Sequence, residues 1–240
     1  EGIEVLTGAK VLSARAEGKK VRVEIANSAS GRVVRTADRV LVAVGRSPRT
    51  EDLGLEEMGV KLENGFVKVN SRMETNVDGI YAVGDVIGAP MLAHSAFAEG
   101  LCAVANIMGK TEEVDYGKIP SCMFGFPQVA SFGVTEAAAR RSGEGIVIGR
   151  SEYRSSGRAA AEGETDGFVK ILAREGSGEI IGIHMIGEDS VELISAGLVA
   201  AAADISVEEL AKVVIGHPTF SEMLVEAALD CRAQAIHKVK

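Results

Sequence analysis

A histidine and a carboxylate five positions apart are the residues best placed to do chemistry in this chain. The stretch reads His217-Pro218-Thr219-Phe220-Ser221-Glu222. Pro218 disfavours the α conformation at His217, so we expect an extended histidine and then a helix that begins at or near Thr219. Its first turn would bring Glu222 back towards the imidazole. A carboxylate that holds one ring nitrogen raises the basicity of the other, which makes a histidine a general base near neutral pH.

The same residues also have a structural interpretation. Thr219 and Glu222 have the spacing of a capping box, which is a common way to start a helix. Spacing alone does not decide between a catalytic pair and a helix cap.

A second stretch, Thr75-Asn76-Val77-Asp78-Gly79-Ile80-Tyr81-Ala82-Val83-Gly84-Asp85, predicts a turn, a short apolar strand and a Gly-Asp pair at its carboxyl end. Ligands of open α/β sheets gather at such strand ends. Gly84 permits close approach of the backbone, and Asp85 offers an acceptor for a sugar hydroxyl. Met91-Leu92-Ala93-His94 then precedes a predicted helix over residues 95–108. Its N-terminus would present N–H groups and a positive dipole to an electron-rich ring or an anion.

Composition excludes several classes of function. The net charge is −8 and the pI is about 5.2, which argues against binding the phosphates of nucleic acid. No apolar run approaches the length of a membrane span, so no membrane partner is expected. The three cysteines, Cys102, Cys122 and Cys231, fit no motif spacing. We therefore expect no metal site, and unpaired thiols suit the cytoplasm.

In this order and at this spacing, the motifs are similar to those of the flavin-dependent pyridine nucleotide-disulfide oxidoreductases, and within that family to the dihydrolipoamide dehydrogenases. The segments that carry the resemblance are residues 42–50, residues 75–85 with 91–94, residues 163–170, residues 183–189 and residues 217–222. The glutathione and mercuric reductases share much of this pattern. Ile215 stands where many dihydrolipoamide dehydrogenases have another histidine, which leaves these two relatives as alternatives.

Three motifs of that family are not found in the chain. They are the Gly-x-Gly-x-x-Gly fingerprint for FAD, the redox pair Cys-x-x-x-x-Cys, and a second glycine fingerprint for the nicotinamide nucleotide. The chain also begins at Glu1 rather than at a methionine. We therefore expect the carboxyl-terminal half of a longer enzyme, inactive by itself and binding FAD weakly or not at all. A non-enzymatic dimerisation module is the alternative from a different class.

The resemblance implies an α/β fold, made of partial FAD- and NAD-binding domains, followed by an α+β dimerisation domain. Residues 1–45 would end the NAD-binding domain, with strands at residues 3–6, 10–14, 21–26, 33–36 and 39–44. Residues 46–115 would be the carboxyl-terminal part of the FAD-binding domain, and residues 116–240 the dimerisation (interface) domain. In the last part the patterns predict strands at 128–133, 146–153, 167–173 and 179–186. They predict helices at 136–142, 190–203, 207–213 and 221–236.

The resemblance also assigns roles to individual residues. Asp85 would bind the ribityl chain of FAD, and Met91, Leu92, Ala93 and His94 would lie along its ring system. Val11 and Gly45 would approach NAD. His217 would exchange a proton with a dithiol substrate, oriented by Glu222.

The parent reaction would be the oxidation of dihydrolipoamide to lipoamide with NAD, in a homodimer in which the histidine serves the other subunit. The lipoyl groups would belong to 2-oxo acid dehydrogenase complexes or to the glycine cleavage system. His184 and His237 are expected to have no catalytic role.

Overall fold

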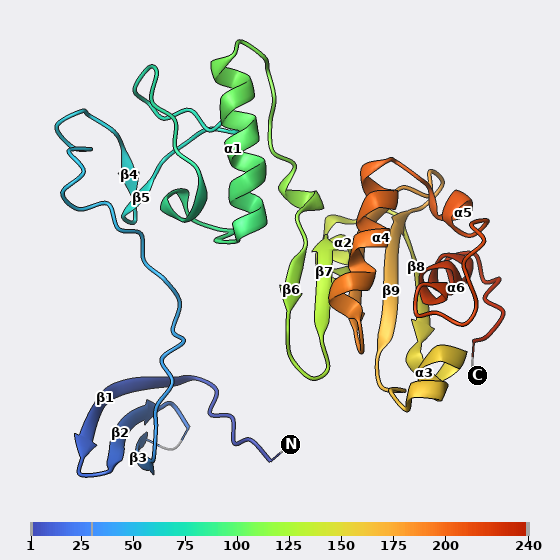
Figure 1. Ribbon diagram of the computed structural model, residues 1–240, viewed down its shortest axis with the longest axis horizontal. Helices are drawn as coiled ribbons and strands as arrows, with labels where there is room; N and C mark the ends of the chain where they lie inside the picture. Colours follow the sequence, from blue (N-terminus) through green and yellow to red (C-terminus); the bar gives the residue numbers. More distant parts are fainter. Residues whose placement is uncertain (1, 30, 239–240) are drawn as a thin grey trace. The chain divides into compact units, whose positions relative to one another are not determined.

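The structure is a computed structural model that describes residues 2–29 and 31–238, and it divides into two units, residues 1–47 and residues 48–240 (Figure 1). The smaller unit is an antiparallel meander of β1 (Ala9–Glu17), β2 (Lys20–Asn27) and β3 (Gly31–Ala37). Gly18 has a φ of +63° in the tight turn between β1 and β2, where its lack of a Cβ is needed. The middle three of the five strands predicted for this region are confirmed.

The strands predicted at residues 3–6 and 39–44 are wrong, because neither segment forms a strand. Their apolar side chains lie open to solvent, with Leu41 91% exposed and Val44 87% exposed. A strand needs a neighbour for its backbone hydrogen bonds, and an apolar run of this kind is typical of a strand buried inside a parallel sheet. The described residues provide no such neighbour.

The first part of the larger unit has little sheet. It contains β4 (Leu62–Glu63), β5 (Phe66–Val67), the short 3₁₀ helix η1 (Gly84–Ile87) and the helix α1 (Ala93–Ile107). The helix predicted at residues 95–108 is thus confirmed. The short strand predicted before Gly84 is reduced to one isolated bridge between Glu74 and Tyr81, since the described residues provide no second neighbour that extends it.

Helix α1 buries polar side chains and exposes large apolar ones, which is the reverse of an ordinary surface helix. Its buried residues include Ser95, Glu99 and Asn106. Its exposed face carries a stripe of large apolar side chains, Phe97, Leu101 and Val104, which Met108 continues just after the helix. In a soluble helix the apolar stripe normally faces the core. The exposed stripe of α1 therefore marks a face suited to being covered.

A five-stranded antiparallel sheet forms the rest of the larger unit, in the order β6-β7-β10-β9-β8. The strands are β6 (Ser121–Met123), β7 (Val129–Gly133), β8 (Ile146–Glu152), β9 (Phe168–Arg174) and β10 (Ile180–Ile186). The four longer strands agree with prediction. The short β6 was not predicted.

The helices of this part are α2 (Glu136–Ser142), α3 (Gly157–Glu162), α4 (Ser190–Ala202), α5 (Val207–Leu210) and α6 (Glu222–Asp230). Short 3₁₀ turns are η2 (Tyr116–Lys118) and η3 (Tyr153–Ser155). The prediction missed α3 and made both α5 and α6 too long at their carboxyl ends. Ala233 takes a φ of +55° just beyond α6, and such a left-handed residue turns the chain away from a helix.

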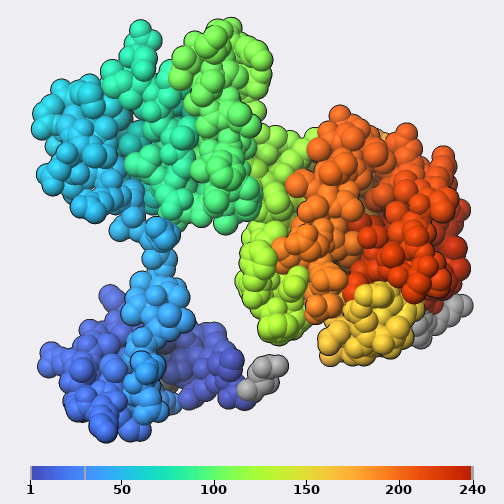
Figure 2. All heavy atoms as spheres, in the orientation of Figure 1, coloured from blue at the N-terminus to red at the C-terminus, as the bar shows by residue number. Residues whose placement is uncertain are grey.

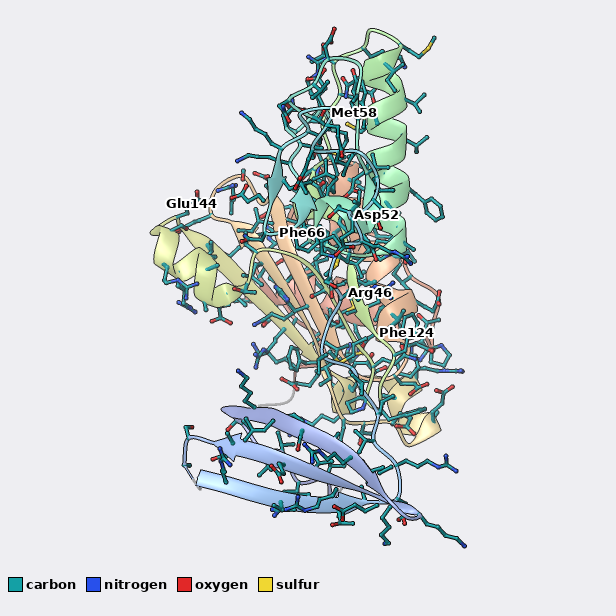
Figure 3. All side chains as sticks on the ribbon, turned by 90° about the vertical axis from the view of Figure 1, so that its left-hand side faces the viewer. Arg46, Asp52, Met58, Phe66, Phe124 and Glu144 are labelled. Atoms are coloured by element: carbon teal, nitrogen blue, oxygen red, sulfur yellow. The ribbon has the colours of Figure 1, made fainter. Side chains whose placement is uncertain are left out.

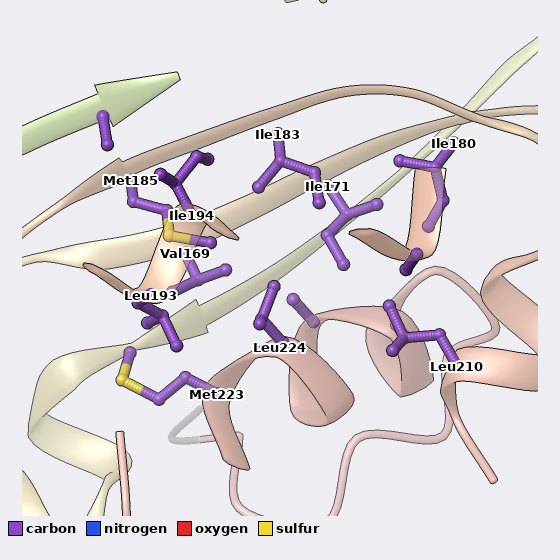
Figure 4. Packing of buried hydrophobic residues seen from close by; sticks show 14 of the residues in the cluster. Val169, Ile171, Ile180, Ile183, Met185, Leu193, Ile194, Leu210, Met223 and Leu224 are labelled. Carbon is purple, nitrogen blue, oxygen red and sulfur yellow. The ribbon is translucent and has the colours of Figure 1, made fainter. Parts of the chain in front are cut away.

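Helices α4 and α6 meet over the same face of the sheet and enclose the main core. Figure 4 shows Ile171 and Ile183 of the sheet facing Ile194 of α4 and Leu224 of α6, and all four are at most 3% exposed. Gly197 allows this approach, because a Cβ added there would lie 2.5 Å from Cδ1 of Ile183. The packed sheet and α4 thus provide a firm base for α6 and for the loop before it.

Candidate functional site

The structure brings His217 and Glu222 into direct contact. Nδ1 of His217 lies 2.9 Å from Oε1 of Glu222, and the backbone N–H of Thr219 donates to Oε2 at 2.8 Å. The carboxylate therefore holds the imidazole with one oxygen and the loop with the other. This contact leaves Nε2 as the ring nitrogen able to exchange a proton.

Only half of the capping box is formed. Glu222 accepts the Thr219 amide as a capping box requires, but the Thr219 hydroxyl donates to the carbonyl of Gly216 at 2.8 Å. Helix α6 starts at Glu222, with Ser221 before it and no side-chain cap, rather than at Thr219. The local fold thus uses the carboxylate for both the loop and the histidine.

The surroundings of Glu222 favour its charged form. Partial burial acts to raise the pKa of the carboxyl, but the hydrogen bonds from Thr219 and His217 outweigh this, and the pKa lies below its ordinary value. The Glu222 carboxyl is consequently ionised near neutral pH and available to orient the imidazole.

The pair lines a pocket of about 270 Å³ between α6, α3 and the end of β8. Its lining residues are Ser151, Ser155, Ser156, Gly157, His217, Glu222, Met223, Glu226 and His237. A Cβ added at Gly157 would lie 3.7 Å from Cε1 of His217. The His217 side chain is 74% exposed in this chain, so the imidazole stands at the mouth of the pocket.

Two buried aromatic rings anchor the loop from beneath. Phe220 is buried, and its ring centroid lies 5.5 Å from that of Tyr153, which is fully buried. The Tyr153 hydroxyl donates to the carbonyl of Glu188. Sequence reasoning missed Tyr153, although the apolar Phe220 within the motif was a signal that the loop has a buried anchor.

The residues predicted for FAD lie at η1 and at the start of α1. Gly84 has a φ of +78°, which turns the chain into η1 and places Asp85 in its first turn. Leu92 precedes α1, and Nε2 of His94 lies 2.7 Å from the carbonyl oxygen of Pro120. These residues are therefore gathered with each other, in a different part of the unit from α6 and His217 (Figure 1).

Two buried polar groups near these residues were not predicted. Glu99 accepts the backbone N–H of Gly84 at 2.6 Å. The hydroxyl of Ser95 is fully buried and has no hydrogen-bond partner within the part of the chain that the structure describes. The signal in the sequence was the polar side chains four residues apart in an otherwise apolar helix.

The two residues predicted for NAD lie in the smaller unit. Val11 lies on β1 opposite Ile25 and is 58% exposed, so it is not a core residue of this chain. Gly45 has a φ of +99°, but it does not end a strand, because residues 39–44 do not form one.

Among the described residues, no group of three histidine, cysteine or acidic side chains is arranged to hold a metal ion. Within the same part of the chain, no helix is both long and apolar enough to cross a membrane.

Two family models match the chain. The model for pyridine nucleotide-disulphide oxidoreductase matches residues 1–100, and the model for the dimerisation domain of the same family matches residues 119–228. Together the two models account for most of the chain.

Known proteins show the same similarity over nearly the whole chain. The dihydrolipoyl dehydrogenase of Rhizobium etli is 41% identical over 98% of this chain and 50% of its own length. That of Thermus scotoductus is 40% identical over 99% of this chain and 52% of its own length. The crystal structure of LpdA from Mycobacterium tuberculosis superimposes with a TM-score of 0.85, at 28% identity, over 92% of this chain and 48% of that one.

The chain thus spans about half the length of the curated relatives it matches. The expected fold class, partial α/β nucleotide-binding domains followed by an α+β dimerisation domain, is confirmed by the family matches and the structural superposition. The chain belongs to the pyridine nucleotide-disulfide oxidoreductases.

Proposed function

We propose that this chain is part of a flavoprotein that oxidises dihydrolipoamide to lipoamide with NAD, and that His217 is its acid–base residue. The observation that carries the proposal is the 2.9 Å contact between Nδ1 of His217 and Oε1 of Glu222. The carboxylate keeps a proton on Nδ1 and orients the ring. Nε2 can then take the proton of a thiol, which makes the sulfur a nucleophilic thiolate.

Each domain has its own role in the proposed enzyme. Residues 1–45 belong to the NAD-binding domain, residues 46–115 to the FAD-binding domain, and residues 116–240 to the dimerisation domain. Val11 and Gly45 approach the nicotinamide nucleotide. The three free thiols support the cytoplasm as the compartment.

The residues at η1 and α1 fit a flavin. Asp85 would bind the ribityl hydroxyls, and the amides near Met91, Leu92, Ala93 and His94 would face the ring at a helix N-terminus. The buried Ser95 hydroxyl without a protein partner and the left-handed Gly84 support a polar ligand close to this backbone. When bound, FAD supplies the two-electron chemistry between the dithiol and NAD.

The dimerisation domain supports a two-fold homodimer. Large apolar side chains lie exposed around β6 and its turn, including Met123, Phe124 and Phe126, the last 90% exposed; Phe124 is labelled in Figure 3. Burial of such a surface in a self-complementary contact stabilises a dimer. We expect a buried area of roughly 2,000 Å² or more, as in obligate dimers. Light scattering that found only monomer at micromolar concentration would contradict this.

The catalytic proposal is tested by the substitution His217→Gln in a full-length protein that contains this chain and is as long as the relatives. The variant should fold and keep its flavin, while turnover with dihydrolipoamide falls by about 10²–10⁴-fold, the usual scale of general acid–base catalysis. Near-full turnover would disprove the role. Assays with glutathione disulfide and with Hg²⁺ separate the two reductase alternatives from lipoamide chemistry.

The 240-residue chain by itself should show no dehydrogenase activity and should hold FAD weakly or not at all, since the family's fingerprint for the diphosphate is not among its residues. Gel filtration followed by an absorbance spectrum checks this. Stoichiometric flavin after filtration would contradict it.

A further inference from the structure

Helix α6 carries a second histidine–glutamate pair close to the first. Glu226 lies four residues after Glu222, and its Oε1 is 3.1 Å from Nδ1 of His237. Its Oε2 accepts the backbone N–H groups of Ile236 and His237, both at 3.0 Å. After α6 ends, the chain thus returns to the helix and is bonded to it at Ile236 and His237.

The two pairs are bonded in the same way. In each, one carboxylate oxygen meets Nδ1 of the imidazole and the other accepts an amide of the segment that carries the imidazole. Residues four apart lie on one face of a helix, and both imidazoles and both carboxylates line the same pocket. Figure 2 shows the yellow segment of α3 in contact with the red carboxyl-terminal part.

The segment 231–238 is held in place by largely buried carboxylates. The side chains of Glu226 and Asp230 are only 12% and 9% exposed. Asp230 binds Nζ of Lys238 at 2.6 and 2.8 Å and also accepts the backbone N–H of Arg150 at 2.9 Å. Charge-assisted hydrogen bonds of this kind are stronger than neutral ones. Together they fix His237 at the edge of the pocket.

We propose that His237 is a positioning residue for His217, acting by charge: the two imidazoles share one pocket and titrate as a coupled pair. A proton on one disfavours a proton on the other. His237 would thereby increase the fraction of His217 that is neutral and able to accept a proton. The catalytic meaning rests on the role proposed for His217, but the coupling itself does not.

The electrostatics of the pair His217 and Glu222 support this. Burial acts to raise the pKa of Glu222, while Thr219, His217 and, more weakly, His237 lower it. The charge of His237 therefore influences the carboxylate that holds His217. Among the described residues, the other charged groups that line this pocket and the adjoining one, or contact their lining, are Glu222, Glu226 and Asp230 of α6, Arg150 and Glu152 of β8, Arg154 of η3, and Lys238.

The experiment is an NMR pH titration of the imidazoles in the 240-residue chain. In His237→Gln, the midpoint of His217 should rise by a few tenths of a pH unit, the scale for two charges that face one pocket in water-like surroundings. In His217→Gln, the midpoint of His237 should rise by the same amount, since coupling is reciprocal. Unchanged resonances of His94 and His184 serve as the check that each variant is folded.

Lys238→Gln is the matched control, because it removes one positive charge from the same segment without removing an imidazole. Its effect on His217 should be clearly smaller, since Lys238 does not line the pocket that holds the two imidazoles. An unchanged His217 midpoint in His237→Gln would overturn the proposal, as would an equal shift in Lys238→Gln. Failure of the proposed function would show instead as retained turnover in His217→Gln, which these titrations do not measure.

Discussion

The carboxylate of Glu99 accepts the backbone N–H of Gly84, with 2.6 Å between Oε2 and the nitrogen. Glu99 is only 1% exposed, and its other oxygen accepts the hydroxyl of Tyr116 at 3.1 Å. One buried carboxylate thus ties α1 to the turn that begins η1 and to η2. Because Asp85 follows Gly84, Glu99 fixes the turn that presents the residue we propose for the ribityl chain.

Glu99→Ala should therefore destabilise the chain. The change leaves the part-buried Gly84 amide and Tyr116 hydroxyl without their acceptor, and each costs at most the about 1–3 kcal/mol of a fully buried group. Urea unfolding measures the difference. Glu164→Ala, at an exposed position, is the control and should stay within about 0.5 kcal/mol of the parent. Equal effects of the two changes would show that the Glu99 contacts contribute nothing.

The raised pKa of Tyr116 predicts that the folded chain loses stability at alkaline pH. Burial, and then the neighbouring Glu99, raise the pKa of Tyr116 to about 12 from its ordinary value of 10.0. The folded state therefore retains a proton that the unfolded chain has lost. The resulting stabilisation is complete below pH 10.0 and disappears as the pH rises towards 12. Unfolding free energies measured across this window should fall less steeply in Tyr116→Phe; identical slopes would contradict the assignment.

Much of the dimerisation domain could be predicted from sequence for a physical reason. Strands β7, β8, β9 and β10 pair only with neighbours that lie within the same segment of the chain. Their alternating patterns and the turns between them are therefore local and complete. The contact of His217 with Glu222 could be predicted likewise, because it spans a single turn.

Other features depend on contacts that no local pattern encodes. Residues 39–44 have the composition of a buried strand but find no partner strand among the described residues. Helix α1 has a clear apolar stripe, yet periodicity cannot tell that the opposite face is the buried one. The bond between Glu226 and His237 joins residues eleven apart through a left-handed turn at Ala233, and no spacing rule covers it.

Gly149 should be the glycine most sensitive to substitution near the site. A Cβ added there would lie 1.9 Å from the carbonyl oxygen of Ala227 and 2.6 Å from the backbone N of Cys231. Both belong to the end of α6, so Gly149→Ala must push that helix away from β8. We expect a loss of several kcal/mol, beyond ordinary overpacking of about 1–3 kcal/mol, because backbone atoms are displaced.

The control for this change is Gly100→Ala in α1, where an added Cβ meets nothing within 4 Å. Alanine is the better helix former by about 1 kcal/mol, so this variant should be as stable as the parent or more so. Thermal unfolding of both variants gives the comparison. A small effect at Gly149 would mean that α6 does not lie this close to the sheet.

Glu222→Ala separates the structural from the catalytic role of the carboxylate. The change removes the acceptor of the Thr219 amide, and losses of comparable helix-cap contacts cost about 0.5–2 kcal/mol. Burial acts to raise the pKa of Glu222 in the folded state. The contacts with Thr219 and His217 outweigh burial, so this pKa is lowered. Its stabilising contribution is therefore present above the unfolded pKa and is lost as the pH falls through the folded pKa. The stability curves of parent and variant should accordingly differ at neutral pH and converge in acid.

The control is Glu209→Ala, at a complete capping box with Ser206 on α5. It removes a carboxylate that caps a helix but holds no histidine. Both variants should lose stability, and only Glu222→Ala should lower the turnover of the full-length protein with dihydrolipoamide. If the two changes had the same effect on turnover, Glu222 would be a helix cap and His217 would not depend on it for orientation.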